Sequence, residues 1–530
     1  MRASSNRIIL SILCGCLMMT SAAVAQQEPT LHVSQNVTTA YGMTGQFEEQ
    51  YVPQQPQAIY TNYQVADPMA DAEVAYTQQQ AGGQGAYPQY YGGQYDYGYQ
   101  PAYAYQPCES SYSPRLTCGQ WFVTAWLDQG FTYNVDNPHN KMNGPLKFND
   151  RSNEYQLNQT YLSLGRSVAT SGCCWDAGGR VDLLYGSDYL WTSAIGLETY
   201  TRDNNGHAQE DPTALPSRWN SNNGTRSSYP GGGGATRFGL AMPQLYAEFY
   251  IPLHLGLNIK AGHFYSLMGY ESVMSPQNFF YSHSYSMMYG QPMTHTGIVF
   301  SQRLTHGLTG IFGVTRGWDT WEDPNGKLSY LTGIRWNSWD RRTEFSWVAA
   351  TGNETVSGEN PDDSSMKGAI RTNYSMVLSH QLTPRLKVVA QHDLGYENNA
   401  AMERVAGRGS QYLDGHWYSA SGYAFYQLTP KLTLGVRGEW FRDVNSSRIY
   451  RPAYVRDYLG EYVEGQDYSQ VTVGLNWKPC DCLVIRPEAR WDWCGVSRVN
   501  AAGQTVTGGM YNNFTKKSQN TIALSTYITY

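Results

Sequence analysis

The chain is 530 residues long, and charged residues make up only 15% of it, below the roughly 25% usual in soluble proteins. Aromatic residues reach 14% and there are 53 glycines, a composition that favours aromatic-rich strands joined by turns over a helical enzyme core. After residue 25 no run approaches the about 20 apolar residues of a membrane-spanning helix, and a net charge of −6 without a Lys/Arg-rich run excludes a nucleic-acid binder.

Residues 1–25 have the features of a secretory signal peptide. Two arginines precede a short apolar stretch, and Ala23-Val24-Ala25 forms a small-residue cleavage site. The sequence therefore predicts export, with a mature chain that begins at Gln26. The alternative is lipoprotein processing at Leu13-Cys14-Gly15-Cys16, in which Cys16 would be acylated and become the new N-terminus.

Residues 26–118 are rich in Tyr, Gln, Gly and Pro and poor in aliphatic side chains. A segment of this composition cannot bury enough apolar surface to offset the entropy of ordering, so we expect a disordered tail. It contains eight acidic residues and a single basic one, Arg115, for a net charge of −7.

From Trp121 onward, apolar and polar positions alternate in segments of about ten to fourteen residues. Between Leu483 and Trp493, for example, apolar residues fall on one face and four charged residues on the other. A soluble sandwich would not place four charges in its core, whereas a transmembrane β-barrel has lipid on one face and water on the other. We therefore predict an all-β, antiparallel transmembrane barrel over residues 119–530.

The same pattern gives about 16 strands, which alternately follow short and long connections. Short connections match periplasmic turns and long ones match extracellular loops, and this alternation is typical of outer-membrane barrels. With an even number of strands, both ends of the barrel then lie on the periplasmic side, and we expect the acidic tail to lie in the periplasm. The predicted strands begin near residues 120, 154, 174, 237, 254, 293, 307, 326, 341, 366, 385, 411, 431, 465, 482 and 516.

Charged residues on the polar faces of these strands are candidates to line the lumen. On opposite walls they would order water and screen permeating solutes, and the simpler alternative is that they pair across strands to support the wall. The candidates are Arg180, Asp182, Arg335, Arg342, Glu344, Arg371, Arg437, Glu439, Arg486, Glu488, Arg490 and Asp492, to which the same parity adds Lys387 and Asp393.

Two long connections could narrow or plug the lumen. Residues 265–292 are rich in Tyr, Met, Phe, Ser and His, and long barrel loops often fold inward, although an ordinary extracellular loop is an equal alternative. Residues 187–236, with four consecutive glycines, form the second candidate. The residues expected at a constriction are Tyr270, Glu271, Tyr281, His283 and Tyr285.

We predict no catalytic residues, no metal site and no cofactor. The most suggestive dyad, His392 and Asp393, consists of neighbouring residues on a strand, so the two side chains point to opposite faces. The cysteine-rich turns around Cys173-Cys174 and Cys480-Asp-Cys482 are interpreted as local disulfides formed in an oxidising compartment.

Specific stretches resemble the OmpL-like putative β-barrel porin-2 family over roughly residues 119–530. They are Lys260-Ala-Gly-His-Phe-Tyr, Met268-Gly-Tyr-Glu, Asn278-Phe-Phe-Tyr-Ser-His-Ser-Tyr and Gln291-Pro-Met-Thr-His-Thr-Gly. The resemblance implies an outer-membrane porin for the passive diffusion of small hydrophilic solutes or ions. The alternative is a plugged barrel that acts as a surface-binding or structural protein.

The C-terminal strand, Thr521 to Tyr530, is amphipathic and ends in an aromatic residue. It resembles the assembly signal of outer-membrane proteins and implies handling by the barrel-assembly machinery. The expected partners are therefore this machinery, outer-membrane lipid and small solutes or ions, without nucleic acid. Resemblance to porins of this size also implies a possible homotrimer.

Overall fold

A computed structural model describes residues 121–170, 174–198, 237–322, 326–354, 370–405, 409–444, 447–449, 462–463, 465–495, 498–499, 505–506, 509–512 and 514–530. Both the predicted signal peptide, residues 1–25, and the predicted tail, residues 26–118, lie outside these ranges. Within the described residues, no helix is long and apolar enough to cross a membrane.

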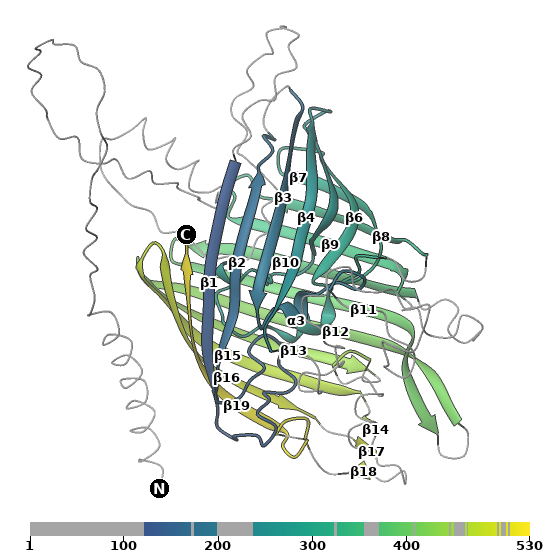
Figure 1. The fold of residues 1–530 in the computed structure, drawn as a ribbon, viewed down its shortest axis with the longest axis vertical. Coiled ribbons are helices and arrows are strands. Elements are labelled where there is room, and N and C mark those ends of the chain that lie inside the picture. The colour runs from purple at the N-terminus through teal and green to yellow at the C-terminus, as the bar shows by residue number, and fades with distance from the viewer. Residues whose placement is uncertain are drawn as a thin grey trace, which may run out of the picture. The chain divides into compact units, whose positions relative to one another are not determined.

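Sixteen antiparallel strands form a closed barrel, in which β1 pairs with both β2 and the last strand, β19 (Figure 1). The dark blue β1 and the yellow β19 lie side by side where the barrel closes. The strands are β1 (Trp121–Asn134), β2 (Glu154–Arg166), β3 (Asp176–Gly186), β4 (Gly239–Ile251), β5 (Leu257–Tyr265), β6 (Thr294–Arg303), β7 (Leu308–Thr315), β8 (Ser329–Asn337), β9 (Thr343–Asn353), β10 (Ile370–Thr383), β11 (Leu386–Val405), β12 (Gly409–Thr429), β13 (Leu432–Val444), β15 (Gln466–Cys480), β16 (Leu483–Cys494) and β19 (Ser518–Thr529).

These bounds confirm the predicted fold class, and every predicted strand start lies within four residues of an observed one. Two features differ. The alternation of short and long connections predicts a long connection near residues 398–410, between the strands that begin near 385 and 411. Instead, β11 and β12 extend and pair through most of it, with a register irregularity between Glu397 and Ala401. Three two-residue strands also form a separate sheet, namely β14 (Tyr462–Val463), β17 (Arg498–Val499) and β18 (Thr505–Val506).

Alternation along each strand separates an outward apolar face from an inward polar face. On β16, Trp491 and Trp493 are 43% and 45% exposed, whereas the intervening Asp492 is 1% exposed. The same alternation on β13 exposes Val436 and Trp440. The predicted faces are therefore observed, because a period of two places every second side chain on the same side of the wall.

The two ends of the barrel differ in their connections. At one end, which we call the short-turn end, two-residue turns join β10 to β11 and β12 to β13. At the other end, the long-loop end, the connections are long and several of them turn into the barrel. Short helical segments mark them, namely α3 (Tyr189–Thr192), the 3-10 turn η1 (Ser275–Gln277) and the π turn η2 (Ser286–Gly290).

The apolar core lies inside the barrel instead of between layers. Its largest cluster combines inward strand residues such as Trp126, Tyr161 and Trp417 with Met287 and Met288 from the connection between β5 and β6. These side chains meet only because that connection enters the lumen. The fold therefore places residues 266–293 at the centre of the candidate functional site.

Candidate functional site

Residues 266–293, which we call the inward segment, leave the wall after β5 and cross the lumen before returning to β6. Gly269, near its start, has a φ of +81°, and a Cβ there would lie 2.1 Å from the Gln291 side chain. This left-handed conformation and close approach require glycine. The turn thus brings the two ends of the inward segment together.

Carboxylates from the barrel wall accept hydrogen bonds from backbone N–H groups of the inward segment. Glu488 on β16 accepts from Tyr281 at 2.8 Å and from Ser282 at 3.2 Å. Glu439 on β13 accepts from Tyr285 and Ser286, both at 2.7 Å. Such charge-assisted bonds are about twice as strong as neutral ones, so the two carboxylates fix the path of the backbone.

Arginines from the same strands donate to backbone carbonyl groups of the inward segment. Arg437 donates to the Ser282 carbonyl at 2.7 Å, and Arg490 donates to the His283 carbonyl at 2.5 Å. Arg486 reaches the carbonyl of Ser275 at 3.2 Å. The barrel wall therefore binds both the N–H groups and the carbonyl groups of one stretch of the inward segment.

Glu271 is the acidic residue of the inward segment that joins this network. Its carboxylate accepts from Arg437 at 2.7 Å and from the Ser284 N–H at 2.7 Å, and it lies 3.3 Å from Nδ1 of His283. Burial opposes ionisation, but Arg437, together with His283 and the N–H donor, holds the Glu271 pKa well below its ordinary value. The site therefore keeps Glu271 ionised.

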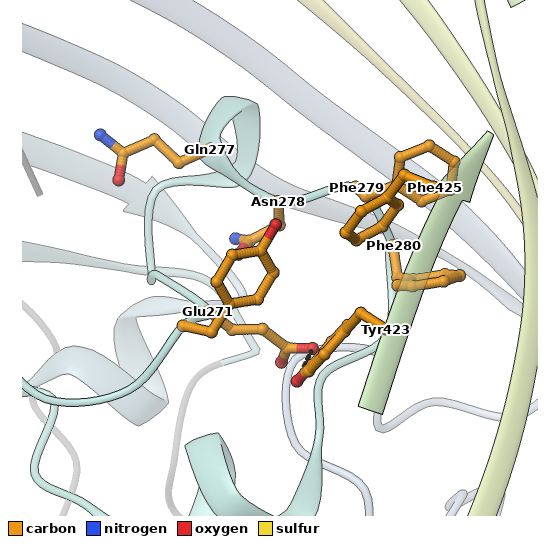
Figure 2. A pocket seen from close by; sticks show the side chains of 8 residues that line it. Glu271, Gln277, Asn278, Phe279, Phe280, Tyr423 and Phe425 are labelled. Carbon is orange, nitrogen blue, oxygen red and sulfur yellow. Dashed lines mark hydrogen bonds between the residues drawn. The ribbon is translucent and has the colours of Figure 1, made fainter. Parts of the chain in front are cut away.

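A small pocket lies between the inward segment and β12, with room for roughly one water molecule. Figure 2 shows Glu271 and Tyr423 facing each other across it, joined by a hydrogen bond of 3.2 Å. Phe279, Phe280 and Phe425 form its aromatic side, with the rings of Phe279 and Phe425 centred 4.9 Å apart. The volume of this pocket fits a water molecule and is too small for a cofactor.

The connection after β3 is linked to the inward segment through side chains of β2. Asp188, after β3, accepts from Asn158 at 2.9 Å and from Gln159 at 2.8 Å. Gln159 also donates to the carbonyl of Val273 at 2.7 Å. Burial raises the pKa of Asp188 to about 7, partly because Asp128 adds a second negative charge nearby. Of the predicted plug 187–236, only residues 187–198 lie within the described ranges.

The raised pKa of Asp188 predicts that stability falls as pH rises. The folded protein holds this proton up to about pH 7, whereas the unfolded chain releases it near the ordinary value of 3.8, so the unfolding free energy decreases between those pH values. We expect a loss on the order of 4 kcal/mol across this window. In urea unfolding from lipid vesicles, Asp188→Asn should make that slope shallower by this contribution, whereas Asp340→Asn, at an exposed turn, should retain the wild-type slope. Parallel slopes for both variants would exclude Asp188 as the titrating group.

All five predicted constriction residues lie in the inward segment and are buried. Besides Glu271 and His283, the hydroxyl of Tyr281 donates to Asn158 at 2.8 Å and that of Tyr285 donates to Asp492 at 2.8 Å. Tyr270 packs against Tyr423, with ring centroids 4.9 Å apart. The structure thus brings these residues together, with their side chains used in packing and hydrogen bonding.

The predicted lumen charges fall into three groups. Arg437, Glu439, Arg486, Glu488, Arg490 and Asp492 surround the inward segment and are at most 6% exposed. Arg371 lies toward the long-loop end and pairs with Glu397 at 2.7 Å. Arg180, Asp182, Arg335 and Glu344 lie on the inward face toward the short-turn end. Arg342 is a correction, because it lies in the turn before β9, exposed, and donates to the carbonyls of Gln381 and Leu382.

The sequence interpretation did not identify several residues that contact the inward segment. Asp128 on β1 pairs with Arg486 at 2.9 Å and accepts from the Ser275 hydroxyl at 2.6 Å. Lys147, in the connection after β1, donates to the Met288 carbonyl at 2.5 Å. Inward parity could have identified Asp128, whereas nothing in the sequence pattern points to Lys147.

The predicted disulfide at the turn after β15 is not formed. Cys480 and Cys482 are free thiols whose Sγ atoms lie 3.1 Å apart, and Cys494 is a buried free thiol on β16. The two thiols of this turn are therefore adjacent without a covalent bond.

Comparison with protein families decides the identity of this barrel. The family described as "Putative beta-barrel porin-2, OmpL-like" matches residues 122–530. The chain belongs to this family. It is therefore an outer-membrane porin, and its inward segment lies inside a porin barrel. Comparison with curated proteins finds no match.

Solved structures of similar fold include several outer-membrane channels. The anion-selective porin of Comamonas acidovorans is 9% identical, with a TM-score of 0.45, and the alignment covers 78% of this chain and 100% of that one. The channel DcaP of Acinetobacter baumannii is 10% identical, with a TM-score of 0.44 and coverage of 78% and 97%. OprB of Pseudomonas putida is 10% identical, with a TM-score of 0.44 and coverage of 78% and 94%.

Proposed function

We propose that this porin passes small hydrophilic solutes or ions by passive diffusion and that the inward segment sets the width of its lumen. The observation that carries this proposal is the set of hydrogen bonds between the barrel wall and the backbone of residues 275–290. Glu439 and Glu488 hold its N–H groups, while Arg437 and Arg490 hold its carbonyls. A peptide held at both kinds of group is a fixed constriction, because moving it would break several charge-assisted bonds together.

The proposed orientation places the short-turn end in the periplasm and the long-loop end outside the cell. Short turns on one side and long connections on the other support it. With β1 beginning and β19 finishing at the short-turn end, the acidic tail would lie in the periplasm. We further propose that outer-membrane lipid surrounds the apolar face and that the barrel-assembly machinery recognises the last strand. We also propose that the functional assembly is a homotrimer.

The plugged barrel remains a second candidate because several connections occupy the long-loop half of the lumen. Lys147 lies 4.3 Å from the ring of Tyr289, and Arg448 lies 4.7 Å from the ring of Trp417. These contacts pack further connections against the inward segment. A barrel closed in this way would bind partners at its surface and conduct nothing.

Planar-bilayer recording separates the two candidates. The full-length protein should form channels of steady conductance, and deleting Ser275 to Tyr289 should raise the single-channel conductance because the peptide that crosses the lumen is lost. Heat-modifiable migration on gels serves as the control that the shortened barrel has folded. A silent full-length protein would support the plugged barrel, and equal conductance of the two proteins would exclude the inward segment as the constriction.

A further inference from the structure

Two cysteines share the turn between β15 and β16, at the short-turn end of the barrel. Cys480 and Leu483 form the last pair of this hairpin, and Asp481 and Cys482 make the turn between them. The Sγ atoms of Cys480 and Cys482 lie 3.1 Å apart, and both residues are exposed. The turn therefore presents two adjacent thiols to the solvent.

Hydrogen bonds to the neighbouring strands hold this turn in place. On one side, the Thr529 N–H of β19 donates to the Cys482 carbonyl at 2.9 Å. On the other side, Nζ of Lys431, in the turn before β13, donates to the Pro479 carbonyl at 2.9 Å. Because the backbone is bound on both sides, the two thiols stay close together.

The two sulfur atoms have different hydrogen-bond environments. The backbone N–H groups of Cys482 and Leu483 donate to the sulfur of Cys480, and the Cys482 thiol is a third donor. Such donors stabilise a thiolate, which is the nucleophilic form of cysteine. The Asp481 carboxylate opposes this effect, but it is fully exposed and lies 3.9 Å from the Nζ of Lys478. The turn therefore favours a thiolate at Cys480 and a protonated thiol at Cys482.

We propose that Cys480 and Cys482 form a thiol–disulfide exchange site whose substrate is the disulfide of another molecule. In the orientation proposed above, this site faces the periplasm. A nucleophilic thiolate next to a second thiol is the arrangement that such an exchange requires, because the second thiol completes the reaction that the first one begins.

The exchange has two steps. The Cys480 thiolate attacks one sulfur of the external disulfide, which forms a mixed disulfide and releases the first thiolate. Cys482 then loses its proton and attacks the Cys480 sulfur, which forms the Cys480–Cys482 disulfide and releases the second thiolate. The turn loses two electrons and the external disulfide gains them. The two protons given up by the cysteines pass through water to the two released thiols.

Oxidised glutathione tests this site on the full-length protein, folded in detergent micelles and first reduced. Mass spectrometry of the peptide that contains the turn measures the products. The wild-type peptide should lose two hydrogens and retain no glutathione, and reduced glutathione should reverse this change. Cys482→Ser lacks the second thiol and should stop with one glutathione on Cys480. Cys480→Ser should react at Cys482 roughly three- to ten-fold more slowly, because the more stabilised thiolate is lost.

The source of the disulfide is distinguished by a second probe, an oxidised protein of the Cys-x-x-Cys type. Reaction of the turn with both probes would identify a site open to small and protein disulfides alike. Reaction with oxidised glutathione alone would identify a site for small disulfides.

Cys494→Ser provides the matched control, because Cys494 is 5% exposed and lies at the other end of β16. Its turn should react as in the wild type, and heat-modifiable migration on gels shows that each variant has folded. Equal rates for Cys480→Ser and Cys482→Ser would overturn Cys480 as the nucleophile. A wild-type turn that keeps glutathione, or a turn disulfide that reduced glutathione cannot open, would overturn the exchange. These outcomes do not depend on conductance, so they leave the proposed channel function intact.

Discussion

Replacing Arg437 by methionine should loosen the inward segment and raise both the mean single-channel current and its fluctuation. Arg437 is fully buried and bonds to Glu271 at 2.7 Å, to the Ser282 carbonyl at 2.7 Å and to the Thr472 hydroxyl at 3.1 Å. Its loss leaves the Glu271 carboxylate buried without its main counter-charge, which typically costs about 3–5 kcal/mol. The strand ladder does not depend on this side chain, so the cost should fall on the inward segment.

The second-site variant Glu271→Gln completes a double-mutant cycle. Adding it to Arg437→Met removes the unpaired carboxylate and should restore part of the steady current, since the two residues act as one unit. Arg442→Met is the control for a pair at the outer surface, where exposed ion pairs contribute about 0–1 kcal/mol. A steady, wild-type current in Arg437→Met would mean that the wall arginine does not hold the inward segment.

Val436→Arg should impair folding into lipid, because it places a charge on the outward face of β13. Val436 is 39% exposed, next to the inward Arg437, and lies within the apolar stretch of the strand. Arginine on the lipid face costs about 2–4 kcal/mol near the bilayer midplane and about 0–1 kcal/mol near the interface. Refolding yields in vesicles, and the free energy of unfolding in guanidinium, measure this loss.

Val444→Arg is the matched control at the interface. It lies on the same strand and face as Val436 but at the last residue of β13, two residues beyond the native Arg442. The small cost expected there contrasts with the large cost at Val436. Equal unfolding free energies for the two arginine variants would contradict the assigned depth of β13 in the membrane.

Most of the wall could be predicted from the sequence because strand pairing is local. On β16, alternating residues from Leu483 to Trp493 sort themselves by a period of two, and antiparallel neighbours follow one another along the chain. The faces and the strand starts follow from this rule. It fails for Arg342, which lies in a turn, where the alternation of a strand no longer applies.

The content of the lumen could not be predicted, because its contacts join residues far apart in the chain. Glu488 binds Tyr281 across 207 positions, and Arg437 binds Glu271 across 166. Periodicity placed these charges on the inward face, but it carries no information about what they meet there. Arg437 and Glu488 bind backbone groups of the inward segment, and every residue possesses such groups. The sequence therefore does not mark the partners, and only the three-dimensional path of the inward segment decides which backbone groups meet these two side chains.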